Sequence, residues 1–85
     1  MLKARGSELI GKIVISEETG RKFGVVGDIK FIAESGELLS IVLKDPTKHA
    51  RDANLEKDEN GNILIPFSTV KSVGDFVIIS EKELV

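Results

Sequence analysis

The sequence predicts an all-β fold: a small antiparallel β-barrel of five to six strands with one short helical turn. Two observations carry this prediction. Apolar residues recur with a period of two over most of the chain, which is typical of half-buried strands. Turn-forming residues, mostly glycines, separate these segments at short intervals, so successive strands should pair as antiparallel hairpins. A sheet of this size usually curls into a barrel, because closure removes its unpaired edges.

The chain has 85 residues, which is the length of one domain. We expect that domain to span residues 1–85, with a core over about 9–80 and a polar loop at 46–61. A domain this small buries only roughly 60–65% of the surface that its unfolded chain exposes. The core should therefore be thin, and a deep substrate cavity is not expected.

The first half of the chain reads as two strands joined by a turn. Alternation of apolar and polar residues predicts the first strand over 9–16. Gly20 supplies the positive φ that the following hairpin loop needs. The second strand, over 23–33, is the clearest in the sequence. Gly24 and Gly27 interrupt it, and glycines inside strands mark bulges or corners.

A second hairpin turn at 34–37 leads into a third strand over 38–43. Asp45-Pro46 ends this strand, because proline cannot donate a hydrogen bond to a ladder. The segment 46–59 that follows is polar and mixed in charge. We expect an exposed loop there, with room for one helical turn.

Asn60-Gly61 is the strongest short hairpin signal in the sequence and introduces a strand over 62–67. Residues 68–71 favour a short helical turn, with Ser68 as its cap. The remaining elements are a turn at 73–75 and a last strand over 76–79.

The residue inventory excludes several kinds of site. The chain has no Cys and one His, which excludes a disulfide framework, a thiolate nucleophile and a Cys- or His-rich metal centre. A net charge of -2 provides no basic footprint for nucleic acid. We find no secretory signal and no apolar run of roughly 18–20 residues, and therefore expect a cytoplasmic protein without membrane insertion. Abundant Lys, Glu and Ile favour a thermophilic source.

His49 lies in the polar loop, near Asp45 and Asp52 in the sequence. A proton shuttle or a metal site needs several convergent groups, so we interpret His49 as a solvated loop residue. The same loop carries four carboxylates: Asp52, Glu56, Asp58 and Glu59. A calcium loop that begins at Asp52 fails, because Lys57 stands where a Gly is needed and Ile63 where a Glu is needed. The sequence therefore predicts no catalytic, cofactor-binding or metal site.

Two further features have structural interpretations. Gly20, Gly24 and Gly27 flank Arg21 and Lys22, but a phosphate-binding fingerprint would continue into a helix, and these glycines precede and interrupt a strand. The aromatic residues of the strand that follows, Phe23 and Phe31, fall on the same face as other core candidates and offer no stacking platform for bases. At the end of the chain, apolar Leu84 and Val85 favour docking on the domain or on a partner over a frayed end.

Several short motifs, taken together in order and spacing, resemble the PRC-barrel family, named for the photosynthetic reaction centre H subunit. The matching segments are 9–14 (Leu-Ile-Gly-Lys-Ile-Val), Gly20, 24–31 (Gly-Val-Val-Gly-Asp-Ile-Lys-Phe), 65–67 (Ile-Pro-Phe), Val70, 73–75 (Val-Gly-Asp) and 76–79. The resemblance covers about residues 9–80, whereas the loop at 46–59 has no counterpart that we can match.

The resemblance implies a non-enzymatic protein–protein interaction module. Family members act as the assembly domain of the reaction-centre subunit and as the protein-binding domain of a bacterial ribosome-maturation factor. Short stand-alone versions are typical of archaea, where some are adaptors of the cell-division machinery, and this chain is similar to those. We therefore expect a cytoplasmic adaptor that binds protein partners, works as a homodimer, uses no cofactor and takes no small-molecule substrate.

Two alternatives belong to other classes. An RNA-processing or ribosome-maturation role would have the barrel bind a ribosomal protein or RNA, although the net charge makes direct nucleic-acid binding unfavourable. An enzyme would need a site assembled across a dimer interface from carboxylates and His49. A change in any detected activity on His49→Ala would favour that class.

Overall fold

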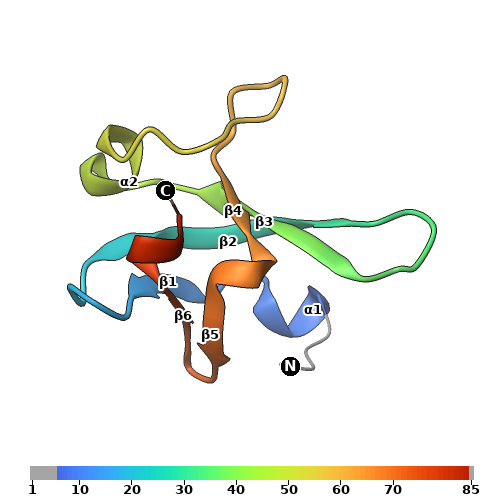
Figure 1. The fold of residues 1–85 in the computed structure, drawn as a ribbon, viewed down its shortest axis with the longest axis horizontal. Coiled ribbons are helices and arrows are strands. Elements are labelled where there is room, and N and C mark those ends of the chain that lie inside the picture. Colours follow the sequence, from blue (N-terminus) through green and yellow to red (C-terminus); the bar gives the residue numbers. More distant parts are fainter. Residues whose placement is uncertain (1–5, 85) are drawn as a thin grey trace.

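The computed structural model describes residues 6–84. Six strands form one sheet with the spatial order β4-β3-β2-β1-β6-β5 (Figure 1). The strands are β1 (Ile13–Ser16), β2 (Lys22–Phe31), β3 (Leu38–Lys44), β4 (Leu64–Pro66), β5 (Val70–Val73) and β6 (Phe76–Ile79). The helical elements are α1 (Gly6–Leu9), α2 (Lys48–Asp52) and the 3₁₀ turns η1 (Phe67–Thr69) and η2 (Glu81–Glu83). The predicted all-β class is confirmed.

The sheet is mixed, so the prediction of a wholly antiparallel sheet is wrong. β1 and β6 pair in parallel, with Val14 beside Val77, whereas the other strand pairs are antiparallel. The hairpin argument applies only to strands that follow one another along the chain, and this pair joins the first strand to the last. The order of strands also ends at β4 and β5 without closing, so the sheet is open.

Several element boundaries differ from the sequence prediction. Leu9 ends helix α1, and Gly11 with φ of 85° separates that helix from β1, so the first strand starts at Ile13. The helical turn expected at 68–71 is η1, which has no side-chain cap, and Ser68 lies inside it. Val70 then begins a sixth strand, β5. The chain has more than the one helical turn expected, because short turns without apolar periodicity leave little trace in a sequence.

Bulges decide which β2 side chains face the core. Gly27 is an extra residue between the pairs Val26–Leu43 and Asp28–Val42, which confirms a bulge at this glycine. A Cβ there would lie 2.8 Å from the Lys44 Cβ, so the close approach requires glycine. Because each bulge shifts the alternation, Phe23 is fully buried and Phe31 is 52% exposed. The expectation that both rings face the core is wrong for Phe31.

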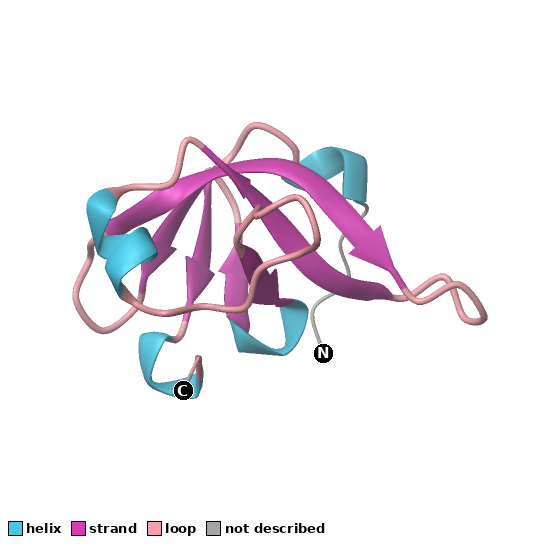
Figure 2. Ribbon diagram, turned by 90° about the horizontal axis from the view of Figure 1, so that it is seen from above, coloured by secondary structure: helices cyan, strands magenta, loops and turns pink. Residues whose placement is uncertain are grey.

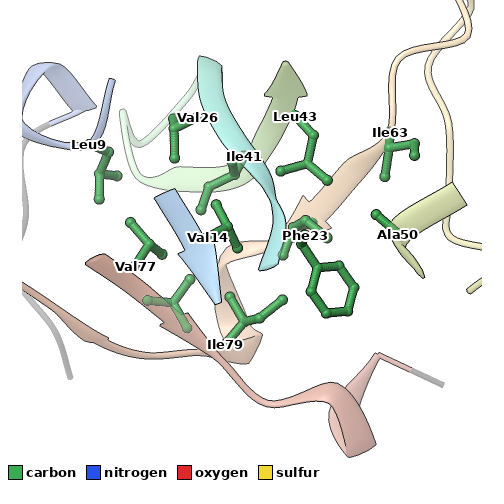
Figure 3. Packing of buried hydrophobic residues seen from close by; sticks show 12 residues of the cluster. Leu9, Val14, Phe23, Val26, Ile41, Leu43, Ala50, Ile63, Val77 and Ile79 are labelled. Carbon is green, nitrogen blue, oxygen red and sulfur yellow. The ribbon is translucent and has the colours of Figure 1, made fainter. Parts of the chain in front are cut away.

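The core lies inside the curled sheet (Figure 3). Its buried apolar residues are Leu9, Val14, Phe23, Val26, Ile41, Leu43, Ala50, Ile63, Ile65, Val70, Val77 and Ile79. Ala50 belongs to α2, in the middle of the segment expected to be an exposed loop. Thr47 caps this helix by accepting from the Ala50 N–H at 3.2 Å, and its hydroxyl donates to the Lys22 carbonyl at 2.8 Å. The polar loop is therefore partly helical and tied to β2.

The β2–β3 hairpin projects beyond the rest of the domain, as the green ribbon of Figure 1 and the long arched strands of Figure 2 show. β4 pairs with β3 only from Ser40 to Val42, so β4 does not accompany the outer part of this hairpin. Within residues 6–84, no helix is long and apolar enough to span a bilayer.

Candidate functional site

A half-open pocket of about 570 Å³ lies between α2, the segment after it and the C-terminal turn η2. Its lining residues are His49, Asp52, Ala53, Asn54, Leu55, Glu81 and Leu84. Leu55 and Leu84 pack against the hydrophobic core and give the pocket apolar walls. The lining therefore combines apolar contact area with an imidazole, carboxylates and an amide.

His49 and Glu81 form a hydrogen-bonded pair at the edge of this pocket. The His49 Nε2 lies 3.1 Å from the Glu81 Oε2, and both side chains are about a quarter exposed. The His49 ring also stands edge-on to Phe23, with ring centroids 5.1 Å apart. The other Glu81 oxygen, Oε1, accepts from the Thr19 hydroxyl at 2.7 Å. One carboxylate thus connects α2, the β1–β2 turn and η2.

A second carboxylate fixes the same C-terminal turn. Glu18 accepts from the Ser80 hydroxyl at 2.7 Å and from the backbone N–H of Glu81 at 2.6 Å. Leu84 follows this turn and packs against the core, in agreement with the docking expected of it. Val85 lies outside the described residues, so docking of that residue stays a prediction.

Hydrogen bonds set the electrostatics of the cluster. Donation from the Ser16 and Thr19 hydroxyls and contact with His49 hold the pKa of Glu81 below its ordinary value, against the opposing effect of burial. The Ser80 hydroxyl does the same for the pKa of Glu18. Both carboxylates are therefore stabilised in the ionised form, in which their oxygens are committed to holding the C-terminal turn.

We expect Glu81→Gln to reduce stability by about 1 kcal/mol at pH 7, because the amide cannot pair with His49 as a carboxylate does. A lowered folded-state pKa stabilises the fold above the ordinary value of 4.5, and this stabilisation disappears as pH falls through the folded-state value. The difference between Glu81→Gln and wild type should therefore shrink below about pH 4.5. Urea unfolding at pH 7 and pH 3 measures it. A difference that stays constant would contradict the assignment, and Glu59→Gln, at an exposed loop position, is the matched control.

The structure places the other sequence candidates apart from one another. Asp52 lines the pocket with His49, but its carboxylate lies 3.9 Å from the Lys48 Nζ. Asp58 accepts from the backbone N–H groups of Asn60 and Asn62 at 2.9 Å and so closes the Asn-Gly turn. Among residues 6–84, no three acidic, His or Cys side chains gather in a way that could hold a metal ion.

His49 is half-buried and paired, so the interpretation as a solvated loop residue is wrong. The sequence pattern does not single out Glu81 as the hydrogen-bond partner of His49, because the two residues are 32 positions apart. The described residues that line the pocket include no hydroxyl or amine nucleophile. The arrangement is suited to binding an apolar group beside hydrogen-bonding ones.

Large apolar side chains are also exposed outside the pocket. Phe31, Ile32 and Leu39 lie at the outer part of the β2–β3 hairpin, with 52%, 38% and 50% of their surface exposed. We call this group the tip surface. Exposed apolar groups of this size on a small domain mark interaction sites.

Comparison with known proteins identifies the family. A model described as the PRC-barrel domain matches residues 1–85. A protein of Methanocaldococcus jannaschii, named only as uncharacterized, is 34% identical over 65 residues, which are 76% of this chain and 68% of that protein. The second match places a similar chain in an archaeon and supplies no activity.

Proposed function

This chain belongs to the PRC-barrel domain family, and from that premise we propose that it is a non-enzymatic adaptor that binds another protein and works as a homodimer in the cytoplasm. The observation that carries the proposal is the exposure of large apolar side chains on an 85-residue domain, above all at the tip surface. A domain with a thin core gains buried apolar area by association.

We assign the partner protein to the pocket between α2 and η2. Its apolar walls can take one side chain of a partner, and His49, Asn54 and Asp52 offer hydrogen bonds around it. The hydrogen bonds of Glu81 and Glu18 fix the C-terminal turn that forms one side of the pocket. A preformed pocket loses less conformational entropy on binding. The cellular role that we propose is assembly of a multiprotein complex, such as the archaeal cell-division machinery.

The test fills the pocket with a large side chain and measures how much of the partner the protein still captures. Ala53 is exposed and is the C-cap residue that follows α2, so Ala53→Arg places a long side chain in the pocket without disturbing the core. We expect the immobilised variant to retain at most a tenth of the partner that the wild type captures from a lysate of the source organism. Quantitative mass spectrometry measures the ratio.

The matched control is Glu59→Arg, which adds the same side chain at an exposed position outside the pocket and should leave capture unchanged. Equal capture by Ala53→Arg and wild type would overturn the assignment of the pocket. Capture that disappears after nuclease treatment, and that weakens steeply with salt, would replace the adaptor with the RNA-associated alternative.

A further inference from the structure

The outward face of the central strands is apolar from strand to strand. The register gives two rows of paired residues across the sheet. The first row is Lys44, Val25, Ile13 and Phe76, and the second is Lys22, Ile15, Ile78 and Ser72. We call the five apolar residues of these rows the sheet face: Ile13, Ile15, Val25, Phe76 and Ile78.

The sheet face is unusual because the opposite faces of the same strands already form the core. Val14 and Val77 are fully buried, while the neighbouring Ile13 and Ile78 on the outward side are half-buried and Phe76 is 44% exposed. A sheet with one solvated face normally carries polar residues at its outward positions. Apolar residues at both sets of positions are typical of strands that are covered on both faces.

The borders of the sheet face and of the tip surface carry opposite charges. Lys22 and Lys44 are exposed at the β2–β3 border of the sheet face. At the other border, the Lys12 ammonium group donates to the Gly74 carbonyl, and the exposed Asp75 follows Gly74 in the chain, so that border carries one charge of each sign. The sheet face therefore has a basic border with two lysines.

The tip surface has an acidic border. Glu34 and Glu37 are exposed in the loop that joins β2 to β3, directly beside the three apolar residues of the tip surface. Lys30 is the nearest cation on the hairpin, and its ammonium group lies 3.9 Å from the Asp58 carboxylate. The tip surface thus matches the sheet face in apolar character and opposes it in charge.

We propose that the tip surface of one copy docks on the sheet face of a second copy, and that the second copy returns the same contact. Two reciprocal contacts related by a two-fold axis close a dimer, because each residue pair occurs twice. The hairpin projects from the domain, so its tip can reach a neighbouring molecule (Figure 1). This proposal rests on the homodimer of the proposed function and specifies its interface.

Charge favours this arrangement over the two symmetric alternatives. Contact between two tip surfaces would bring Glu34 and Glu37 against their own copies, and contact between two sheet faces would oppose lysines to lysines at the matching border. Like charges placed together across an interface cost affinity and suppress the wrong pairing. Only the contact of tip with sheet face places each acidic border on a basic one.

The experiment is a charge exchange in the full chain. Glu34→Lys with Glu37→Lys makes the tip basic, and Lys22→Glu with Lys44→Glu makes the border of the sheet face acidic. All four residues are exposed, and Glu at position 44 keeps the Cβ that faces Gly27. Because the chain has no Trp or Tyr, light scattering with refractive-index detection measures mass over a concentration series.

We expect each double variant alone to dimerise at least tenfold more weakly than the wild type. Mixing the two variants should restore wild-type dimerisation, because in the mixed dimer the basic tip of one variant meets the acidic border of the other, and the acidic tip of the second variant meets the basic border of the first. The dimer of the wild type should also weaken as salt rises. Glu59→Lys with Lys57→Glu, at exposed loop positions outside both surfaces, should leave dimerisation unchanged.

A wild type that stays monomeric at high micromolar concentration would overturn the homodimer of the proposed function and this interface together. A wild-type dimer whose affinity is insensitive to either double variant would overturn the interface alone. Failure of the mixture to restore dimerisation would do the same. Assemblies larger than a dimer would contradict the reciprocal, closed arrangement.

Discussion

Phe23→Ala should cost about 3–5 kcal/mol of the free energy of unfolding, the range measured for truncation of buried aromatic side chains. Phe23 is the largest fully buried side chain among the described residues. It packs within a thin core, where few neighbouring side chains can move in to fill the space. Against a total stability of about 5–15 kcal/mol for an ordinary domain, this loss leaves a large fraction of molecules unfolded or close to unfolding.

The same substitution also reaches the pocket. The Phe23 ring supports the His49 imidazole, which pairs with Glu81. We therefore expect the nuclear magnetic resonance signals of the His49 ring to shift in any Phe23→Ala molecules that remain folded. Urea unfolding followed by circular dichroism measures the stability, because the chain has no Trp for fluorescence.

Phe31→Ala is the matched control, because it removes the same atoms from an aromatic residue of the same strand. Phe31 is 52% exposed, so its truncation should change stability by less than about 1 kcal/mol. Equal losses for the two variants would contradict the burial pattern that the bulges of β2 produce. Phe31→Ala should instead weaken dimerisation, since the ring belongs to the tip surface.

Local signals account for the part of the fold that the sequence predicts. Gly20, Gly36 and Gly61 lie at hairpin turns with positive φ, as their positions between apolar runs indicate. Turn chemistry is local, so it can be read from a few neighbouring residues. The parallel pairing of Val14 with Val77 is not local, and no neighbouring residue of either strand encodes it.

The candidate site lies beyond local signals for the same reason. His49 and Glu81 meet because α2 is capped by Thr47 and docked on β2, while Glu18 holds the C-terminal turn. Apart from the local Thr47 cap, these contacts join residues far apart in the sequence, and charged residues in polar segments carry no periodicity. Two apolar residues in polar surroundings offer a signal, Leu55 in the polar loop and Leu84 near the end of the chain, and both line the pocket.

Gly24→Ala should destabilise the fold through the backbone. Gly24 has φ of 154°, a backbone conformation that residues with a side chain rarely adopt. It costs about 1–3 kcal/mol for a residue other than glycine. A Cβ there would also lie 3.0 Å from the Lys44 carbonyl oxygen and 3.2 Å from the Pro46 Cα. These are backbone atoms that cannot rotate away, so we expect a loss at or above the upper end of that range.

The control for Gly24→Ala is Gly36→Ala, because Gly36 has φ of 74° but a Cβ there would meet open space. This variant should lose only the roughly 1–2 kcal/mol that the left-handed conformation costs. Equal losses of stability in the two variants would mean that the contact with the Lys44–Pro46 backbone does not contribute to the destabilisation. If the contact matters, Gly24→Ala must displace that backbone, and Pro46 is followed directly by the Thr47 cap of α2. Partner capture should then fall together with stability in Gly24→Ala and remain intact in Gly36→Ala.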